Sequence, residues 1–477
     1  MPKFDAIIIG AGQAGPPLAG RLTAAGKTVA MIERKLFGGT CINTGCIPTK
    51  TLIANAYAAQ TARRAAFYGV VLEGEVSVDM KAVKARMEEV SGASRTGVEK
   101  WLRTMQNCTV YTGHARFESP TTVRVVSASS SNSKSSKSNG EDLIEAPKIY
   151  LNVGARASVP TLPGVDQIDY LTNTSMLALD TLPEHLVIVG GSYIGIEFGQ
   201  MYRRFGSRVT IVERAPHLIS HEDEDVSIAV EEILEKEGIT LRTHAECITF
   251  SKDANGPIVG VDCKKGGPPA VHGSHVLLAM GRRPNTDDLG LDRAGVHTDE
   301  QGYITIDDQL RTSVPGIYAM GDCNGKGGFT HTSYNDFEIA AANLLDNDPR
   351  RVSDRIPCYA LYCDPPLGRI GLTETQVRAE VKRTGKPALI GTRPMTRVGR
   401  AVEKGESQGF MKILADAESK KILGASILGV GGDEAIHCIL DIMYAGAPYT
   451  TLQRAVHIHP TVSELIPTVL GDLKPLT

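Results

Sequence analysis

Long apolar segments are missing from this sequence of 477 residues, in which no run approaches the roughly 20 apolar residues that a membrane-spanning helix needs. A charge of one sign is missing too. With 51 basic against 54 acidic residues the formal net charge is −3, so no general positive field would attract nucleic acid or an anionic membrane. The 42% hydrophobic content is typical of a globular chain of roughly two to four domains, and small-molecule chemistry is the favoured function class.

An export signal is also absent from the N-terminal segment MPKFDAIIIGAGQAG, because Asp5 precedes a short apolar run that leads directly into glycines. We therefore expect neither a secreted nor a membrane-anchored protein. Nine cysteines scattered through such a chain fit a reducing compartment, where a stable structural disulfide is disfavoured and a transient catalytic one is allowed. The predicted location is cytoplasmic.

One pattern of strand, glycine turn, helix and second strand occurs twice. The first copy has a strand at residues 6–9, the turn GAGQAG, a helix at 15–25 and a strand at 28–32. The second copy has the strand LVIVGG, the helix YIGIEFGQMYRRFG and the strand RVTIVER. An acidic residue closes each copy at the same distance, since Glu33 lies 23 residues after Gly10 and Glu213 lies 23 residues after Gly190. Two such βαβ units predict two dinucleotide sites.

The glycines of these turns let the backbone approach a pyrophosphate, which then lies at the positive end of the helix. The acidic residue accepts hydrogen bonds from the ribose hydroxyls. The predicted residues are Gly10, Gly12, Gly15 and Glu33 in the first site and Gly190, Gly191, Gly195 and Glu213 in the second. Ser192 replaces the middle glycine of the second turn, which predicts a looser site. Glu213 favours NADH because a carboxylate repels a 2′-phosphate, whereas the adjacent Arg214 keeps NADPH as the alternative.

The stretch GGTCINTGCIPTK places Cys41 and Cys46 five residues apart. On a regular helix this spacing leaves the Cα atoms about 8.7 Å apart, which is too far for a disulfide. A bond would therefore require Cys41 in an irregular turn before a helix, and the flanking glycines would allow such a turn. The helix N-terminus would also lower the thiol pKa. Zinc ligation is disfavoured because no second ligand pair is nearby, and two unrelated core thiols would not explain the glycines.

Two further segments differ from the βαβ units. Val126 to Asp142 is a serine-rich, low-complexity stretch, which we expect to be a mobile loop between the strand TTVRVV and a strand near residues 148–152. From about Arg351 the pattern of alternating strands followed by helices, the last at 432–445, predicts a separate α+β domain. Its cysteines, Cys358 and Cys363, are interpreted as buried thiols.

The cysteine segment, the two βαβ units, and the stretches AMGRRPN, GIYAMGDC and HIHPTVSEL together resemble the class I FAD-dependent pyridine nucleotide-disulfide oxidoreductases, in order and over nearly the whole chain. This resemblance implies an α/β fold with two Rossmann-like dinucleotide-binding domains, for FAD and for NAD(P), and a C-terminal α+β dimerisation domain. The predicted domains are 1–154 (FAD, first part), 155–280 (NAD(P)), 281–348 (FAD, second part) and 349–477 (dimerisation).

The resemblance also implies residue roles. Cys46 would be the thiol that faces the flavin, and Cys41 the interchange thiol that faces the substrate. Lys50 would pair with Glu197 near the flavin N5, and Tyr193 would gate the nicotinamide pocket. Asp322 would bind the FAD ribityl chain, and further cofactor contacts would come from Gly39, Thr40, Lys50 and Gly281.

His459 and Glu464 would form an acid–base dyad that reaches into the active site of the partner subunit, which implies a homodimer. A dithiol cycle needs such a dyad because a proton must leave and return to a thiol near neutral pH. The predicted cofactors are thus FAD and NADH or NADPH. No metal site, nucleic-acid partner or membrane partner is predicted.

Within the family the stretches CDPPLGRIGLTE and FTHTSYNDFEIAAANLL are similar to the mercuric reductase-like branch. The predicted function is NAD(P)H-dependent reduction of a disulfide or metal-ion acceptor, within cell redox homeostasis, with the acceptor unassigned. The ending GDLKPLT lacks the C-terminal cysteine pair of mercuric reductases, and His459 stands where they usually have tyrosine. Dihydrolipoamide dehydrogenase is the alternative, and glutathione reductase or a non-catalytic redox-sensing flavoprotein is a weaker one.

Overall fold

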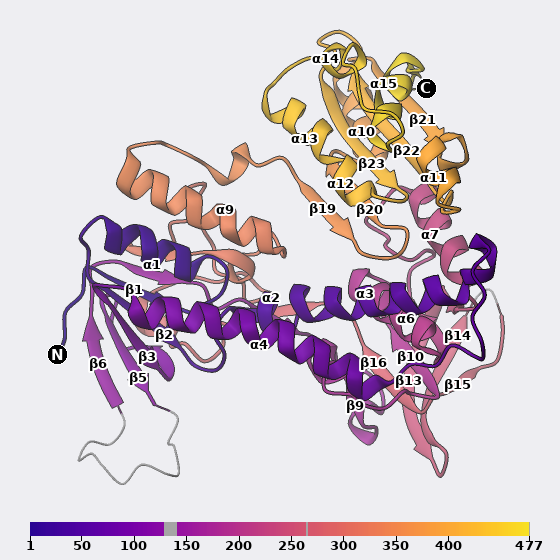
Figure 1. Ribbon diagram of the computed structural model, residues 1–477. Helices are drawn as coiled ribbons and strands as arrows, with labels where there is room; N and C mark the ends of the chain where they lie inside the picture. Colours follow the sequence, from indigo (N-terminus) through magenta and orange to yellow (C-terminus); the bar gives the residue numbers. More distant parts are fainter. Residues whose placement is uncertain (128–140, 264–265, 477) are drawn as a thin grey trace.

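The computed structural model describes residues 1–127, 141–263 and 266–476. The predicted α/β class is confirmed, with two parallel five-stranded sheets and one antiparallel six-stranded sheet (Figure 1). The serine-rich stretch of the sequence lies largely outside the described residues.

The first parallel sheet has the strand order β18-β7-β1-β2-β3. Its strands are β1 (Ala6–Ile9), β2 (Val29–Glu33), β3 (Cys108–Thr112), β7 (Ile149–Leu151) and β18 (Ile317–Ala319). Every residue of β1 and β2 is buried, as expected for strands covered on both faces. The helix α1 (Gly15–Ala24) connects them, so the predicted βαβ unit is confirmed to within one residue at each end.

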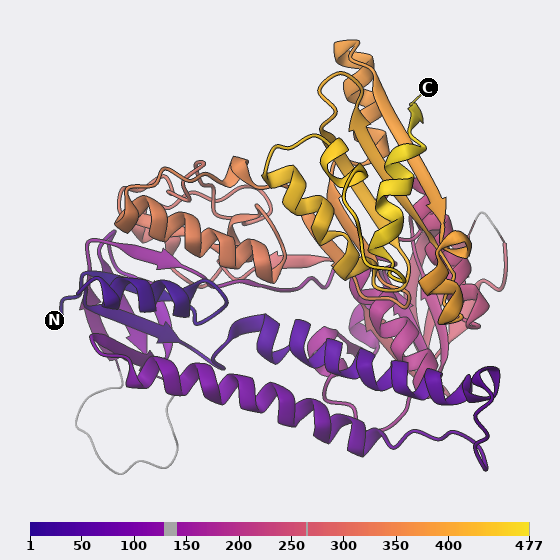
Figure 2. The same ribbon diagram turned by 45° about the horizontal axis from the view of Figure 1, so that its top comes forward.

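Two long helices extend from this sheet toward the second one. They are α3 (Cys46–Arg63) and α4 (Met80–Thr104), which lie side by side in Figures 1 and 2. The helix α9 (Thr330–Ala341) packs beside α1. A small antiparallel sheet at the edge consists of β4 (His114–Phe117), β5 (Thr122–Val126) and β6 (Glu141–Glu145). The strand β6 therefore intervenes before the predicted strand near residues 148–152, which is β7.

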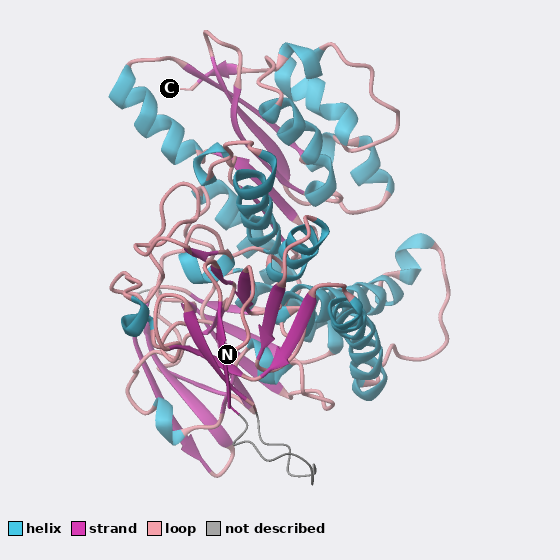
Figure 3. Cartoon of the chain, turned by 90° about the vertical axis from the view of Figure 1, so that its left-hand side faces the viewer, coloured by secondary structure: helices cyan, strands magenta, loops and turns pink. Residues whose placement is uncertain are grey.

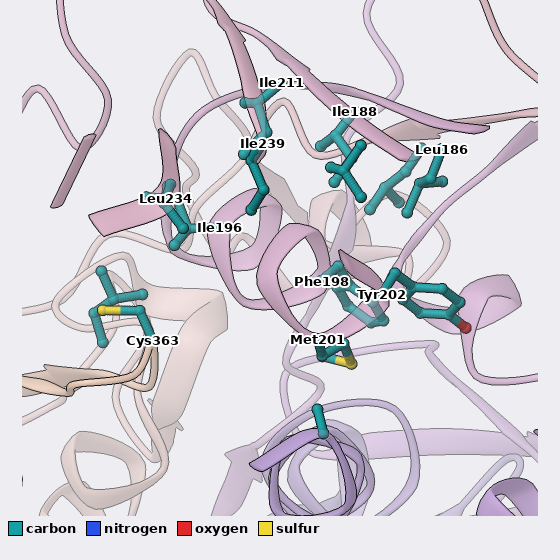
Figure 4. Packing of buried hydrophobic residues seen from close by; sticks show 14 of the residues in the cluster. Leu186, Ile188, Ile196, Phe198, Met201, Tyr202, Ile211, Leu234, Ile239 and Cys363 are labelled. Carbon is teal, nitrogen blue, oxygen red and sulfur yellow. The ribbon is translucent and has the colours of Figure 1, made fainter. Parts of the chain in front are cut away.

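The second parallel sheet has the order β12-β11-β10-β16-β9. Its strands are β9 (Tyr170–Leu171), β10 (His185–Val189), β11 (Arg208–Val212), β12 (Thr240–Arg242) and β16 (His275–Leu278). The helix α6 (Tyr193–Phe205) completes the second predicted βαβ unit, and α7 (Glu224–Lys236) follows. Figure 4 shows the core around α6, with Leu186, Ile188 and Ile211 of the strands on one side of the helix and Phe198, Met201 and Tyr202 on the other.

The chain crosses between the two parallel sheets twice, and the crossing segments pair with one another. The strands β8 (Ala155–Ala157) and β17 (Arg282–Pro284) form an antiparallel ribbon, after which β18 returns to the first sheet. An antiparallel sheet of β13 (Ala245–Asp253), β14 (Gly256–Cys263) and β15 (Ala270–His272) is attached to the second. The four domain boundaries proposed from the sequence stay predictions.

The C-terminal region forms the antiparallel sheet β19-β20-β23-β22-β21-β24. Its strands are β19 (Cys358–Leu361), β20 (Leu367–Gly371), β21 (Ala388–Pro394), β22 (Phe410–Asp416), β23 (Ile422–Leu428) and β24 (Lys474–Pro475). Figure 3 shows helices on both sides of this sheet, and α10 (Glu374–Thr384) covers one side. The predicted helical stretch at 432–445 is two helices, α12 (Gly432–Ala435) and α13 (His437–Tyr444).

The other short helices described are α2 (Gly39–Asn43), α5 (Asn173–Met176), α8 (Leu291–Ala294), α11 (Gly399–Glu403), α14 (Thr450–Gln453) and α15 (Ile466–Gly471). Among the residues that the structure describes, no helix combines the length and the apolar character required to cross a bilayer.

A buried lysine ties the C-terminal sheet to the second parallel sheet. The side chain of Lys412 on β22 is 1% exposed, and its Nζ lies 3.1 Å from Asp223, 2.7 Å from Asp225 and 3.1 Å from Glu374. Asp223 also accepts from the backbone amide of Glu374, so strand, helix and loop meet at one charged cluster. The cluster fixes how the two regions are held together.

The substitution Lys412→Met should destabilise the protein by roughly 3 kcal/mol, because it leaves the buried carboxylate of Asp223 without its counter-charge. The thermal-unfolding midpoint at fixed protein concentration measures the effect. Lys382→Met, on the exposed face of α10, is the control and should change the midpoint little. Equal midpoints for both variants would contradict a stabilising role of the cluster.

Candidate active site

A cavity of about 1440 Å³ opens where the regions meet, and most of the predicted residues line it. The predicted residues in its wall are Gly10, Gly12, Glu33, Gly39, Thr40, Cys41, Cys46, Lys50, Tyr193, Glu197, Gly281 and Asp322. Those not in its wall are Gly15, Gly190, Gly191, Gly195, Glu213, His459 and Glu464. The first glycine turn and the cysteine segment therefore share one space with the start of α6.

The first glycine turn leaves no room for side chains. A Cβ on Gly10, whose φ is 101°, would lie 2.3 Å from the carbonyl oxygen of Asn152, and one on Gly39 would lie 2.8 Å from the Cα of Gly12. The Asn152 side chain accepts from the amide of Gly15 at 3.1 Å, which fixes the start of α1. The bare backbone at a helix N-terminus fits the pyrophosphate of a dinucleotide.

The two acidic residues of the βαβ units are held in the same way. Glu33 accepts hydrogen bonds from the amide of Ala11 at 2.9 Å and of Lys35 at 2.8 Å. Glu213 accepts from the amide of Gly191 at 2.6 Å and of Ala215 at 2.7 Å. Each carboxylate has about four lone-pair positions, so each can still accept from ribose hydroxyls.

Asp322 also lines the cavity, and burial raises the pKa of its carboxyl against the opposing effect of Arg282 at 3.3 Å. This carboxylate and the first glycine turn give the cavity polar groups for a dinucleotide cofactor. The cavity, the turn and these acceptors fit FAD.

Cys41 and Cys46 lie on two separate helices. Cys41 is in the short helix α2, and Cys46 is the first residue of α3, with the break at Thr44 and Gly45. The expectation that Cys41 lies in an irregular turn is thus wrong. The irregularity that brings the two thiols together comes after Cys41, where Gly45 adopts φ −138° and ψ −119°. Both thiols are unbonded in this structure.

The two thiols differ in acidity. A hydrogen bond with Cys41 lowers the pKa of Cys46 to about 6, and the hydroxyl of Thr330 at 3.1 Å and the charge of Lys50 act in the same direction. The same contact, together with burial, raises the pKa of Cys41. Near neutral pH Cys41 therefore keeps its proton, and the negative charge lies on Cys46.

The thiolate absorbance of the reduced protein, measured against a Cys46→Ser variant, should titrate with a midpoint at about pH 6. At pH 7 about nine-tenths of Cys46 should be ionised, because the pH then exceeds the pKa by one unit. Thr330→Val should shift the midpoint upward, since the thiolate loses a donor. A wild-type midpoint above about 8, as for a free cysteine, would contradict the arrangement.

Lys50 and Glu197 form the predicted pair. The ammonium of Lys50 donates to both carboxylate oxygens of Glu197, at 2.9 and 2.8 Å, and lies 4.6 Å from the centre of the Tyr362 ring. Glu197 also accepts from the amide of Tyr362 at 3.1 Å. The α3 and α6 helices are thereby connected at the cavity wall. The role of this pair beside a flavin stays a prediction.

Tyr193 lies in a cluster that was not predicted from the sequence. Its hydroxyl donates to Glu222 Oε1 at 3.0 Å, and the hydroxyl of Tyr359 donates to the same oxygen at 2.6 Å. The two rings are 5.6 Å apart, and Phe329 stacks on Tyr359 at 5.4 Å. Burial raises the pKa of Tyr193, and that of Tyr359 to about 12, so both hydroxyls stay protonated as donors.

His459 and Glu464 form a close pair away from the cavity. The imidazole Nδ1 lies 2.8 Å from Glu464 Oε2, and the side chain of His459 is 79% exposed, against 16% for Glu464. The carboxylate therefore orients an imidazole that points to the outside of this chain. Its predicted function in a partner subunit is not tested by a single chain.

The remaining cysteines correct one prediction. Cys358 is only half-buried and lines the cavity, so its interpretation as a buried thiol is wrong. Cys363 is 3% exposed and is buried as predicted. Thr330, Glu222, Tyr359 and Arg369 are the site residues that the sequence did not reveal. One feature of the sequence could have indicated this cluster, namely the charged Arg369 within the apolar strand segment PPLGRIG.

The family model described as pyridine nucleotide-disulphide oxidoreductase matches residues 4–337, and the dimerisation-domain model of the same family matches residues 358–470. The chain is 34% identical over 99% of its length to the whole of the probable pyridine nucleotide-disulfide oxidoreductase RclA of Escherichia coli K12. Mercuric reductase of Streptomyces lividans is 31% identical, with 97% of this chain and 94% of that protein covered.

Dihydrolipoyl dehydrogenase of Bacillus subtilis is also 31% identical, with 97% and 96% covered. Among solved structures, a Cu(II) complex of the HOCl-induced flavoprotein disulfide reductase RclA from Escherichia coli has a TM-score of 0.86 at 33% identity. The match covers 99% of each chain.

Proposed function

This chain belongs to the pyridine nucleotide-disulphide oxidoreductase family, and on that premise we propose that Cys41 and Cys46 relay electrons from NAD(P)H to a disulfide or metal-ion acceptor. As a member of the family it is a FAD-dependent disulfide oxidoreductase that uses a pyridine nucleotide and carries a C-terminal dimerisation domain. The residue roles, the acceptor and the choice of nucleotide are the proposal.

One observation supports the relay most directly. Cys46 is a low-pKa thiol at the first position of α3, and it lies in the same cavity as the first glycine turn and Lys50. Bound FAD would supply the chemistry that takes a hydride from the nicotinamide and passes its two electrons to the thiol pair. The chain holds the thiolate at Cys46, keeps the proton on Cys41, and stabilises the charge through Thr330 and Lys50.

The acceptor step begins at Cys41 in this proposal. With a disulfide acceptor, the Cys41 sulfur forms a mixed disulfide and releases one thiol; Cys46 then attacks Cys41 and releases the second thiol. Two electrons and the proton of Cys41 leave the pair, the second released thiolate takes up a proton from water, and the Cys41–Cys46 disulfide remains. With Cu(II), the same two electrons reduce two ions to Cu(I). A metal-ion acceptor is favoured because the similar RclA was solved as a Cu(II) complex.

Dihydrolipoamide oxidation is the second candidate. The His459–Glu464 contact at 2.8 Å favours it, because a thiol substrate needs a base to take its proton. In that case electrons would run from dithiol to nucleotide. We propose that the dyad acts on the partner's thiol pair in a cytoplasmic homodimer; its exposure on this chain and its absence from this chain's cavity wall support that arrangement.

NADH is the favoured nucleotide. Wild-type kcat/KM should be higher for NADH than for NADPH by at least about tenfold, the effect of one unfavourable charge contact with Glu213. Glu213→Gln keeps the shape of the side chain and one of its two amide contacts while it removes the charge, so it should shift the ratio toward NADPH. An unchanged ratio would show that Glu213 does not select the nucleotide.

A panel of acceptors tests the function. The purified holoenzyme is reduced anaerobically with NADH or NADPH, and steady-state rates are measured with lipoamide, glutathione disulfide, Hg(II) and Cu(II). We expect turnover with a metal ion or a disulfide other than lipoamide. Fast turnover with lipoamide alone would assign the chain to the dihydrolipoamide branch instead.

A further inference from the structure

A buried charge pair lies behind the Tyr193 cluster. Arg369 on β20 and Glu222, just before α7, have side chains that are 1% and 0% exposed, and Arg369 Nε lies 3.6 Å from Glu222 Oε2. That distance is too long for a hydrogen bond. All three guanidinium nitrogens of Arg369, and Oε2 of Glu222, find no hydrogen-bond partner among the described residues. Arg369 is part of the cavity wall.

This arrangement is unusual because buried polar groups are nearly always hydrogen-bonded. The three unpaired nitrogens of Arg369 therefore lie near the unpaired Oε2 of Glu222 with no hydrogen bond between them. A primary carboxamide matches both sides, since its carbonyl oxygen accepts and its amino group donates. The nicotinamide ring of a pyridine nucleotide carries such a group.

We propose that Arg369 and Glu222 bind the carboxamide of the nicotinamide, with Arg369 donating to its oxygen and Glu222 accepting from its amino group. The inference rests on the proposed gating role of Tyr193. The nitrogens of Arg369 are sealed in this structure, so the ring can reach them only after Tyr193 moves. That movement breaks the hydrogen bond from Tyr193 to Glu222 Oε1, where Tyr359 still donates, and the carboxamide amino group donates to the unpaired Oε2.

The other contacts of the cluster hold Glu222 in place while Tyr193 leaves and the carboxamide enters. Tyr359 also donates to Glu222 Oε1, at 2.6 Å, and it stands opposite Arg369 in the pairing of β19 with β20. Glu222 is thus held by Tyr359 while Tyr193 leaves. Phe329, stacked on Tyr359, completes an apolar wall beside the charges. A ring with one polar substituent fits such a wall, with the substituent toward Arg369.

Equilibrium binding of NAD⁺ to the oxidised holoenzyme, measured by calorimetry, tests the proposal. Arg369→Met should weaken binding by tenfold or more, because a hydrogen bond from a charged donor contributes about that factor or more. Arg369→Lys keeps the charge beside Glu222 but not the fork of donors, and it should bind NAD⁺ with intermediate affinity. Lys382→Met, which removes an exposed cation outside the cavity wall, is the control and should bind like the wild type.

A second measurement needs no variant of Arg369. The 3-acetylpyridine analogue of NAD⁺ keeps the carbonyl oxygen and replaces the amino group by a methyl group. Wild-type protein should bind this analogue about tenfold more weakly than NAD⁺, and Glu222→Gln should reduce that discrimination to a few-fold. Arg369→Lys should weaken both ligands alike, since the carbonyl is common to them.

Normal NAD⁺ affinity in both Arg369 variants would overturn the proposal and leave Arg369 as a purely structural counter-charge. Equal binding of the analogue and NAD⁺ to wild-type protein would overturn the role of Glu222. Failure of the thiol relay would be seen in a different assay, in which dithionite replaces the nucleotide as the reductant. Wild-type and variant proteins alike would then fail to reduce the acceptor. The binding measurements decide the proposal in either case.

Discussion

Cys46→Ser should lower acceptor turnover by roughly a thousandfold or more, the scale expected when one member of a catalytic unit is removed. The reason is the position of the low-pKa thiol between Thr330, Lys50 and Cys41. Serine keeps the size and the hydrogen bonds of the side chain, but it cannot form the disulfide. The loss should apply to every disulfide and metal-ion acceptor in the panel.

Two controls separate this effect from misfolding. NADH should still bleach the yellow colour of the Cys46→Ser protein, because that half-reaction does not use the thiols. Cys358→Ser changes the third thiol in the wall of the same cavity and should retain most of the activity. Full activity of Cys46→Ser with every acceptor would end the relay mechanism.

His459→Ala should reduce turnover with disulfide or dithiol substrates by about a hundred- to ten-thousandfold, the contribution typical of general acid–base catalysis. The reduction of the bound cofactor by NADH should be unaffected. His459→Gln, which keeps the polarity but cannot titrate, should be nearly as slow. These results are measured by stopped-flow reduction and by steady-state rates on the same preparations.

A mixing experiment tests the predicted arrangement between subunits. Equal amounts of Cys46→Ser and His459→Ala protein, dissociated and reassociated, should recover about a quarter of the wild-type activity. Half of the dimers are then mixed, and each mixed dimer has one intact site made from both chains. If the dyad served the thiols of its own chain, no mixture of these two variants would regain activity.

The local parts of the fold could be predicted because each rests on a short-range signal. The β1–α1–β2 unit was located to within one residue, since fully buried strands and a glycine turn leave a pattern in the sequence itself. The pairing of Lys50 with Glu197, 147 residues apart, followed from the family resemblance and is present. Composition or periodicity alone would not have revealed it.

The predictions that failed depend on packing between distant segments. The separate helix at Cys41 depends on the unusual backbone of Gly45, and five-residue spacing alone cannot distinguish a lead-in turn from two helices. The half-buried Cys358 borders a cavity formed by three regions of the chain. The contact of Tyr193 with Glu222 likewise joins α6 to a loop 29 residues away, and no period connects them.

The two βαβ glutamates have a consequence for how the protein acquires its ligands. Glu33 and Glu213 are each fixed by hydrogen bonds from two amides of the surrounding backbone. Each glutamate has therefore already lost its side-chain conformational entropy during folding. Binding of a ribose to it costs little further conformational entropy.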